Sequence, residues 1–99
     1  MYKHLVLWRL KAAPLDKPAL AQEIKRRLDS LPAAIKEIRQ YEVGINIGAY
    51  GASFFDVGLI SAFDDKAAFM RYIKYPEHDT VVAFISANTA DEQIVDFES

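Results

Sequence analysis

His4-Leu5-Val6-Leu7-Trp8-Arg9-Leu10, close to the start of the chain, decides the fold. Over Tyr2 to Lys11 this stretch has strand periodicity, which places Val6 and Trp8 on one face and Leu5 and Leu7 on the other. Both faces of the strand are therefore apolar at its centre. Helices that pack on a sheet cover one of its sides, so the second side of this strand needs another cover.

A helix is predicted directly after this strand. Ala12, Ala13 and Pro14 interrupt the strand, and Asp16 is a suitable N-cap. The apolar residues that follow recur at helical spacing as far as Pro32, which is expected to end the helix. These residues are Leu20, Ile24, Leu28 and Leu31.

Three more strands are predicted, over Ile38 to Ile47, Phe54 to Phe63 and Gln93 to Glu98. The first two follow one another directly and are expected to be antiparallel neighbours. The segment between them, residues 48–53, is too long for a two-residue hairpin turn, so we expect a mobile loop. Loops of this kind often close over a pocket.

Two further helices are predicted between the third and fourth strands. Asp64 or Asp65 can cap the first of them, which ends at Tyr75. Pro76 suits the start of the second, which runs to about Asn88. Their apolar faces consist of Phe69, Tyr72 and Ile73 in the first helix and Val81, Val82, Phe84 and Ile85 in the second.

This element order predicts one α+β domain over residues 1–99, with the order strand, helix, strand, strand, helix, helix, strand. Four strands with helices between them favour an antiparallel sheet that helices cover on one side, the split βαβ arrangement. An identical second chain is the simplest cover for the other side. We therefore expect an obligate homodimer in which two sheets form a barrel.

Composition excludes several classes of protein. The chain has no cysteine, which rules out disulfides and Cys-based metal sites and fits a reducing compartment such as the cytoplasm. Charged residues interrupt the first ten residues, so these form neither a signal peptide nor a membrane span. The net charge is −2 and the one basic cluster is Lys25, Arg26 and Arg27, so no nucleic-acid partner is expected.

Several stretches together resemble the stress-responsive dimeric α/β-barrel (Dabb) family over essentially the whole chain. They are the opening His4 to Leu10, Tyr41 to Asn46, the helix start at Asp64, Tyr72 to His78 and the closing Val95-Asp96-Phe97. The resemblance implies a ferredoxin-like fold and a dimer whose sheets pack face to face. It also implies a pocket between each sheet and its helices.

The family resembled here includes plant stress proteins and a cofactor-free polyketide cyclase that performs an intramolecular aldol condensation. A tyrosine and a histidine serve the chemistry of that cyclase, and the matching positions here are Tyr72 and His78. This chain departs from it at Tyr75, where a histidine commonly precedes the proline, and in the short loop Gly48 to Gly51. Because this tyrosine and histidine resemble general features of the family, they do not by themselves assign cyclase activity.

His78 and Tyr72 are the candidate catalytic residues. A neutral imidazole can remove a proton near neutral pH, and a tyrosine hydroxyl can hydrogen-bond the resulting enolate oxygen. The alternative is that His78 caps the third predicted helix and that Tyr72 is an amphipathic wall residue. His4 shares a strand face with Val6 and Trp8, so it either points into the same cavity or is a hydrogen-bonded core residue.

Aromatic residues are the candidate walls of a ligand pocket, although core packing explains them equally well. The candidates are His4, Trp8, Tyr41, Phe54 and Phe84. Asp56 is expected to be a solvated carboxylate at a sheet edge. We predict no metal, because two histidines lack a carboxylate at ligand spacing, and no cofactor, because no nucleotide-binding motif occurs.

Three functions stay open at this point. The first is a homodimer that binds an apolar or aromatic small molecule without turnover, or that serves only as a stable folded unit. The second is a cofactor-independent cyclase, isomerase or lyase in which His78 is the base and Tyr72 or His4 stabilises the oxyanion. The third is a relative of the monooxygenases that share this dimeric architecture.

Overall fold

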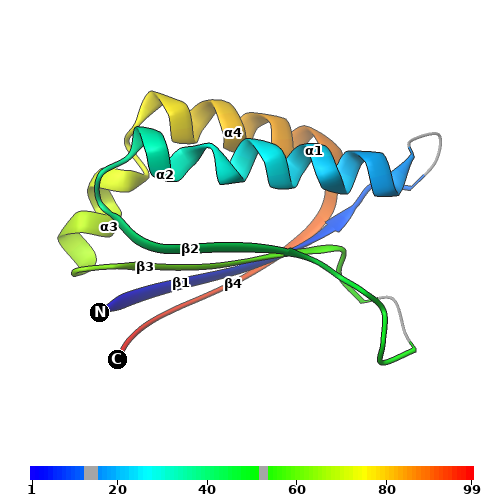
Figure 1. Ribbon diagram of the computed structural model, residues 1–99, viewed down its shortest axis with the longest axis horizontal. Coiled ribbons are helices and arrows are strands. Elements are labelled where there is room, and N and C mark those ends of the chain that lie inside the picture. The colour runs from blue at the N-terminus through cyan, green and yellow to red at the C-terminus, as the bar shows by residue number, and fades with distance from the viewer. Residues whose placement is uncertain (13–15, 52–53) are drawn as a thin grey trace.

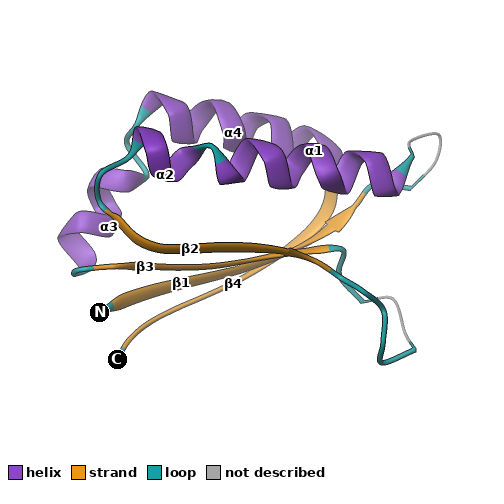
Figure 2. Ribbon diagram, viewed as in Figure 1, coloured by secondary structure: helices purple, strands orange, loops and turns teal. Residues whose placement is uncertain are grey.

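The computed structural model describes residues 1–12, 16–51 and 54–99. Its helices lie together on one side of a single sheet, as Figures 1 and 2 show, and the other side of the sheet is bare. The elements are β1 (Tyr2–Leu10), α1 (Lys17–Asp29), α2 (Leu31–Ala34), β2 (Ile38–Ile45), β3 (Val57–Phe63), α3 (Lys66–Tyr72), α4 (Pro76–Asn88) and β4 (Thr89–Glu98). This is the α+β arrangement predicted from the sequence.

The sheet has the strand order β2-β3-β1-β4, and all neighbouring strands are antiparallel. β1 is therefore a central strand, with Val6 opposite Leu59 of β3 and opposite Ile94 of β4. Directly paired residues project to the same side of a sheet. The register thus sorts the side chains of all four strands into a face toward the helices and an outer face.

The core lies between the helices and the inner face of the sheet. Phe63 and Ile24 are completely buried there, and Val6, Trp8 and Leu10 of β1 are buried beside them. α1 contributes Ala21, Ile24 and Leu28. Of the predicted apolar stripe, Ile24 and Leu28 are buried in α1, Leu20 is half-buried and Leu31 lies in α2. Burial of this kind stabilises a fold by about 25 cal/mol for each Å² of apolar surface removed from water.

Asp16 caps α1 and Asp65 caps α3. Each carboxylate accepts a hydrogen bond from a backbone N–H three residues later, at 3.2 Å from Ala19 and 2.8 Å from Ala68. Such caps satisfy amide groups that would otherwise lack partners at the start of a helix. Asp64, the other candidate cap, pairs instead with Arg39.

Several predicted element boundaries were wrong. Pro32 does not end the first helix; α1 ends at Asp29, and Pro32 lies in the first turn of α2, where its missing N–H costs nothing. β4 begins at Thr89, four residues earlier than predicted, because it follows α4 without a turn.

The hairpin strands are shorter than predicted. β2 stops at Ile45, because the side chain of Asn46 bonds the carbonyl of Phe55 and the amide of Gly48 and so turns the chain. β3 begins at Val57, so Phe54 precedes the strand. Asp56 was expected to be solvated, but it is half-buried and accepts a hydrogen bond from the Leu10 amide at 2.8 Å.

Two of the sequence predictions fall on residues that are not described. Ala13 and Pro14 of the predicted strand break, and Ala52 and Ser53 of the loop predicted over residues 48–53, lie outside the described residues. Within the described part of the chain, no helix is long and apolar enough to cross a membrane.

Candidate functional site

A cavity of about 240 Å³ lies between the inner face of the sheet and the helices. Most of its wall is aliphatic or aromatic, and its polar members come from β1, β4 and the segment from α3 to α4. The polar and aromatic lining residues are His4, Trp8, Phe69, Tyr72, His78 and Glu92; the aliphatic ones are Val6, Leu28, Leu31, Leu59, Ile73, Val81, Val82, Ile85 and Ile94.

His4 is fixed in this wall by a carboxylate on the neighbouring strand. Its Nδ1 lies 2.5 Å from Oδ1 of Asp96, which is directly opposite it in the β1–β4 register. Tyr2 donates a second hydrogen bond to Oδ2 of Asp96 at 2.8 Å. A carboxylate partner requires the proton on Nδ1, so Nε2 of a neutral His4 is an acceptor.

His78 is the second histidine of the cavity, and it lies in the first turn of α4. Its ring packs edge-on against Tyr72, with the ring centroids 4.6 Å apart. Nδ1 is buried without a hydrogen-bond partner among the described residues, since the Asp79 carboxylate at 3.8 Å is too far away. Burial lowers the pKa of His78 below 6.5, against a smaller opposing effect of Asp79, so the imidazole is neutral at pH 7.

Tyr72 is buried on α3, and its hydroxyl lies 2.9 Å from the hydroxyl of Tyr41 on β2. Burial raises the pKa of Tyr72 to about 12, so the phenol keeps its proton. Either hydroxyl can donate in this pair. When Tyr41 donates, the Tyr72 proton is free for a second acceptor.

Glu92 adds a carboxylate to the β4 side of the cavity. It accepts a hydrogen bond of 2.7 Å from the indole Nε1 of Trp8, the residue opposite it in the sheet. Glu92 and the His4-bound Asp96 therefore place two acidic groups along one strand. Among the described residues, however, no group of three or more His, Asp and Glu side chains is arranged to hold a metal ion.

The structure brings four of the predicted site residues to one cavity: His4, Trp8, Tyr72 and His78. The other three are not in its lining. Tyr41 lies behind it, one hydrogen bond from Tyr72.

Phe54 and Phe84 do not line this cavity. Phe54 is exposed, because β3 starts only after it. The ring of Phe84 is covered by the guanidinium of Arg27, 3.8 Å above it, because that side of α4 faces α1.

Sequence reasoning missed two groups of the site, Asp96 and Glu92. Both lie on the inner face of β4, one on each side of Ile94, whereas Val95 and Phe97 occupy the outer face. A carboxylate between apolar residues of a strand, as in Val95-Asp96-Phe97, is the signal that could have found Asp96. Its pairing with His4 depends on strand order, which the sequence does not specify.

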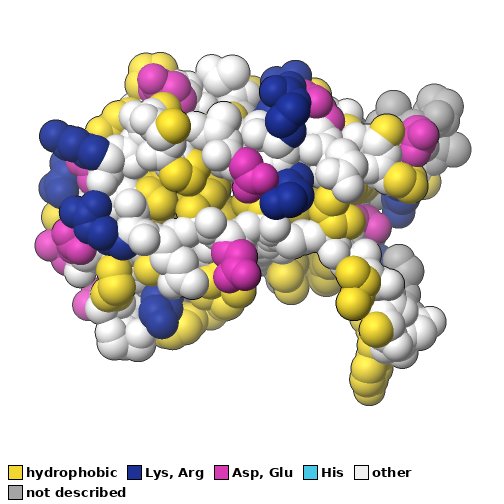
Figure 3. All heavy atoms as spheres, in the orientation of Figure 1, with side chains coloured by type: hydrophobic (Ala, Val, Ile, Leu, Met, Phe, Trp, Pro, Cys, Tyr) yellow, Lys and Arg dark blue, Asp and Glu magenta, His cyan; other side chains and the backbone are white. Residues whose placement is uncertain are grey.

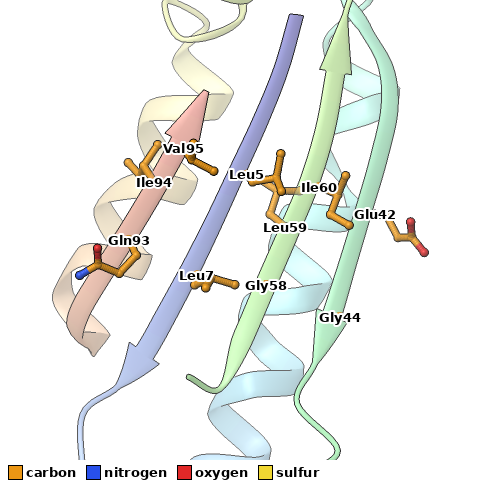
Figure 4. Close-up of a pocket in the computed structure, with 10 residues that line it drawn as sticks. All are labelled: Leu5, Leu7, Glu42, Gly44, Gly58, Leu59, Ile60, Gln93, Ile94 and Val95. Carbon is orange, nitrogen blue, oxygen red and sulfur yellow. The ribbon is translucent and has the colours of Figure 1, made fainter. Parts of the chain in front are cut away.

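A larger hollow, about 580 Å³, lies on the outer face of the sheet (Figure 4). Its wall is mainly apolar, and Gly44 and Gly58 lie opposite one another in its floor. The described lining of this hollow contains no histidine or tyrosine. The candidate catalytic side chains therefore belong to the smaller cavity on the inner face. The lining residues are Leu5, Leu7, Glu42, Gly44, Gly58, Leu59, Ile60, Gln93, Ile94 and Val95.

Comparison with known proteins identifies relatives for nearly the whole chain. The family model of the stress responsive A/B barrel domain matches residues 2–99. An uncharacterized protein of Streptomyces coelicolor is 31% identical over 84 residues, which are 84% of each chain.

Two solved structures are 28% identical to this chain. A dimeric protein of unknown function with a ferredoxin-like fold from Bacteroides fragilis superposes with a TM-score of 0.86, over 99% of this chain and 95% of its own. A dimeric ferredoxin-like protein of unknown function from Thermobifida fusca has a TM-score of 0.85, over 97% and 88%. The fold of this chain is therefore ferredoxin-like, and these relatives of it are dimers.

A hydroxynitrile lyase from Passiflora edulis shares the fold at lower identity. It is 17% identical, with a TM-score of 0.83 over 97% of this chain and 90% of its own. Similarity at this level establishes a common fold and not a common reaction.

Proposed function

The chain belongs to the stress responsive A/B barrel domain family, and we propose that it is a homodimer that binds a small apolar or aromatic molecule between its sheet and its helices. The observation that carries this proposal is the cavity on the inner face, where an apolar wall holds a few polar groups near one another. Small-molecule sites commonly have this composition. His4, His78 and Tyr72 would orient the ligand, and Trp8 would pack against it.

The cavity favours a ligand of modest size. Its volume of about 240 Å³ is below the roughly 300–1,000 Å³ of sites for drug-sized molecules. A single substituted aromatic ring or a short chain with one or two carbonyl groups suits this space.

The charges around the cavity favour an uncharged ligand. Glu92 lies in the wall, Asp96 lies behind His4, and the described lining contains no lysine or arginine. The neutral His78 supplies no positive charge at pH 7. A bound carboxylate would be desolvated beside these acidic groups, so phenols and ketones should bind better than the corresponding acids.

A cofactor-independent enzyme is the second candidate function, and the state of His78 favours it. This imidazole is neutral and partly desolvated, as suits a general base, and His78 is part of the cavity lining. In this reading His78 removes a proton from the carbon next to a ligand carbonyl. The Tyr72 hydroxyl then hydrogen-bonds the enolate oxygen. His4 was the other predicted donor, but its Nδ1 proton is bound to Asp96, so it could donate from Nε2 only as an imidazolium.

The homodimer forms through the outer face of the sheet in this proposal. Leu7, Ile60, Val95 and Phe97 are exposed on that face or at its rim, which is too large an apolar surface for a monomer to leave open. The relatives from Bacteroides fragilis and Thermobifida fusca are dimeric, which supports a dimer of this chain. The proposal also keeps the cytoplasm as the compartment, since a chain without cysteine needs no oxidising environment.

A thermal-shift screen tests the binding function. The wild type, His78→Ala and the control Ser86→Ala, an exposed position of the same helix, are heated with phenols, aromatic ketones, β-dicarbonyl compounds and the matching carboxylic acids. A ligand at a hundred times its dissociation constant adds about 2.7 kcal/mol of stability, or several degrees in Tm. We expect a shift with neutral compounds that His78→Ala reduces and Ser86→Ala keeps. Equal shifts in all three proteins would contradict a site at His78.

Isotope exchange separates binding from catalysis. In D₂O, a base at His78 exchanges the acidic C–H of a bound ketone for deuterium, and NMR measures the rate. An accelerated exchange that His78→Ala and Tyr72→Phe abolish supports the enzyme. Binding without accelerated exchange supports the first function alone.

A further inference from the structure

The connection between β2 and β3 leaves the body of the molecule on the side of the sheet away from the helices, as Figures 1 and 3 show. We call its described part, residues 46–51 and 54–56, the arm. Figure 3 shows hydrophobic side chains on the arm and along the underside of the sheet next to it. The arm and the outer face thus border the same open space.

Hydrogen bonds hold the backbone of the arm in shape. At its base, the Asn46 amide donates to the carbonyl of Asp56 at 2.9 Å, and the Asn46 side chain bonds Phe55 and Gly48 at 2.7 Å each. Further out, the Gly51 amide donates to the Gly48 carbonyl at 3.1 Å. The φ angles of Gly48 and Gly51, 71° and 89°, are ones that other residues rarely adopt.

The side chains on this hydrogen-bonded backbone face water although they are apolar. The exposed fractions are 89% for Ile47, 90% for Tyr50 and 56% for Phe54. The sequence from Ile45 to Phe55 also contains no charged residue. A projecting segment that has a defined backbone and exposed apolar side chains marks a surface for contact with a protein.

The arm is continuous with the outer face of the sheet. A second hollow, about 340 Å³, lies where the two meet, and Asn46, Phe54 and Phe55 form its arm side. It shares Leu7, Gly44 and Gly58 with the larger hollow of Figure 4. A partner that covers the outer face therefore also meets the base of the arm.

We propose that the arm of each subunit packs against the second copy and clasps the rim of its sheet, with Ile47 and Tyr50 as the main contacts. The inference rests on the proposed dimer through the outer face. Packed sheets lie about 10 Å apart, so a second sheet over that face stands beside an arm that projects in the same direction. A two-fold axis repeats the contact, so two arms flank one barrel.

Dilution experiments test this contact. Sedimentation velocity gives the dimer dissociation constant of the wild type, of Ile47→Ser/Tyr50→Ser, and of the control Met70→Ser, an exposed apolar position on α3. The arm variant should raise the dissociation constant at least about tenfold, since buried interface anchors dominate affinity, and the control should not change it. Circular dichroism checks that each variant is folded.

The outcomes separate the arm from the dimer itself. A wild type that is monomeric at all concentrations would overturn the proposed dimer. A dimer with the same dissociation constant in the arm variant would overturn only the clasp. A third outcome is that the wild type sediments with phosphatidylserine vesicles, and that the arm variant does not, although its dimer is unchanged. This result would show that the arm binds a membrane, and it would also overturn the clasp.

Chemical modification of Tyr50 gives a test without substitutions. Tetranitromethane nitrates exposed phenols, and mass spectrometry locates the product. Tyr50 should be nitrated several-fold more slowly above the dimer dissociation constant than below it, because the partner covers the ring. Equal rates at both concentrations would contradict the clasp.

Discussion

The two faces of β1 differ sharply although they belong to the same nine residues. Val6, which points to the helices, is 2% exposed, whereas its neighbour Leu7, which points to the outer face, is 46% exposed. Both are aliphatic and both sit in the middle of the sheet. The helices cover the inner face over β1, although Ile94 of β4 on the same face is 54% exposed, and the outer face has no cover from its own helices (Figure 2).

The difference shows what hydropathy alone can and cannot distinguish. The two faces of β1 are similarly apolar at the centre of the strand, so hydropathy does not say which one the helices cover. The polar groups do differ, because His4, Glu92 and Asp96 lie on the inner side and make a binding cavity there. The outer side carries opposed glycines and mainly aliphatic side chains, with Glu42 and Gln93 beside them, a composition that suits contact with a second sheet.

The largest expected effect is on the inner face. Phe63 is completely buried and contacts the rings of Phe69 and Tyr72, with centroids 5.4 and 4.8 Å away. Phe63→Ala should lower the free energy of unfolding by about 3–5 kcal/mol, through lost burial and a cavity. Urea unfolding at several protein concentrations measures this loss. A loss that disappears at high concentration would show that Phe63 acts through the dimer instead.

The next effect belongs to the outer face. A Cβ on Gly44 would meet nothing within 4 Å in the isolated subunit, so Gly44→Val should leave the monomer folded. In the two-fold dimer each subunit carries the added side chain, so the clash with the partner occurs twice. The free energy of association should become less favourable by about 2 kcal/mol or more, which weakens association at least about thirtyfold. Sedimentation measures association, with Ala67→Val on α3 as the control. An unchanged dimer would show that another surface makes it.

A smaller effect concerns the buried hydroxyl pair of the inner face. Tyr41→Phe removes one partner of the 2.9 Å contact and leaves the Tyr72 hydroxyl unpaired, so stability should fall by about 1–2 kcal/mol. Tyr41→Phe/Tyr72→Phe removes both hydroxyls and should cost less than the sum of the single changes. Chemical unfolding of the three variants measures the coupling, and strict additivity would contradict the hydrogen bond.

The smallest effect is a pH dependence of the inner face. Burial lowers the pKa of folded His78 below its ordinary 6.5, so the unfolded chain binds the proton more tightly. The stabilisation is complete above about pH 6.5 and is lost as the pH falls through the lower pKa of the folded state. Thermal unfolding from about pH 7.5 to pH 5.5 should therefore show a decline in Tm that is shallower in His78→Gln. A parallel decline in the variant would assign the pH effect to other groups.

The sequence predicted the fold well because periodicity is a local signal. Alternation in β1 and the i, i+4 spacing of Leu20, Ile24 and Leu28 each reflect burial by one layer of structure. Boundaries failed where a single side chain redirects the backbone. Asn46 ends β2 by bonding its own turn, and Pro32 starts a helix where an ending was expected.

The candidate site was predicted only in part, for a different reason. Periodicity placed His4 and Trp8 on the strand face that carries Val6, and the family resemblance pointed to Tyr72 and His78; all four line the same cavity. The partners Asp96 and Glu92 come from β4, at the far end of the chain, and their contacts depend on which strand borders β1. Phe54 lies away from this cavity because the strand to which it was assigned begins three residues later.

Because successive side chains of β1 point to opposite faces of the sheet, substitutions in this strand have different consequences from insertions and deletions. Substitutions at single positions alter one face and leave the other intact, so the ligand and the partner can diversify separately. An inserted or deleted residue within Leu5 to Trp8 would exchange the two faces beyond it, and send Trp8 to the partner and Leu7 to the ligand. We therefore expect the members of a lineage from this chain to differ in side chains along β1 and to keep its spacing.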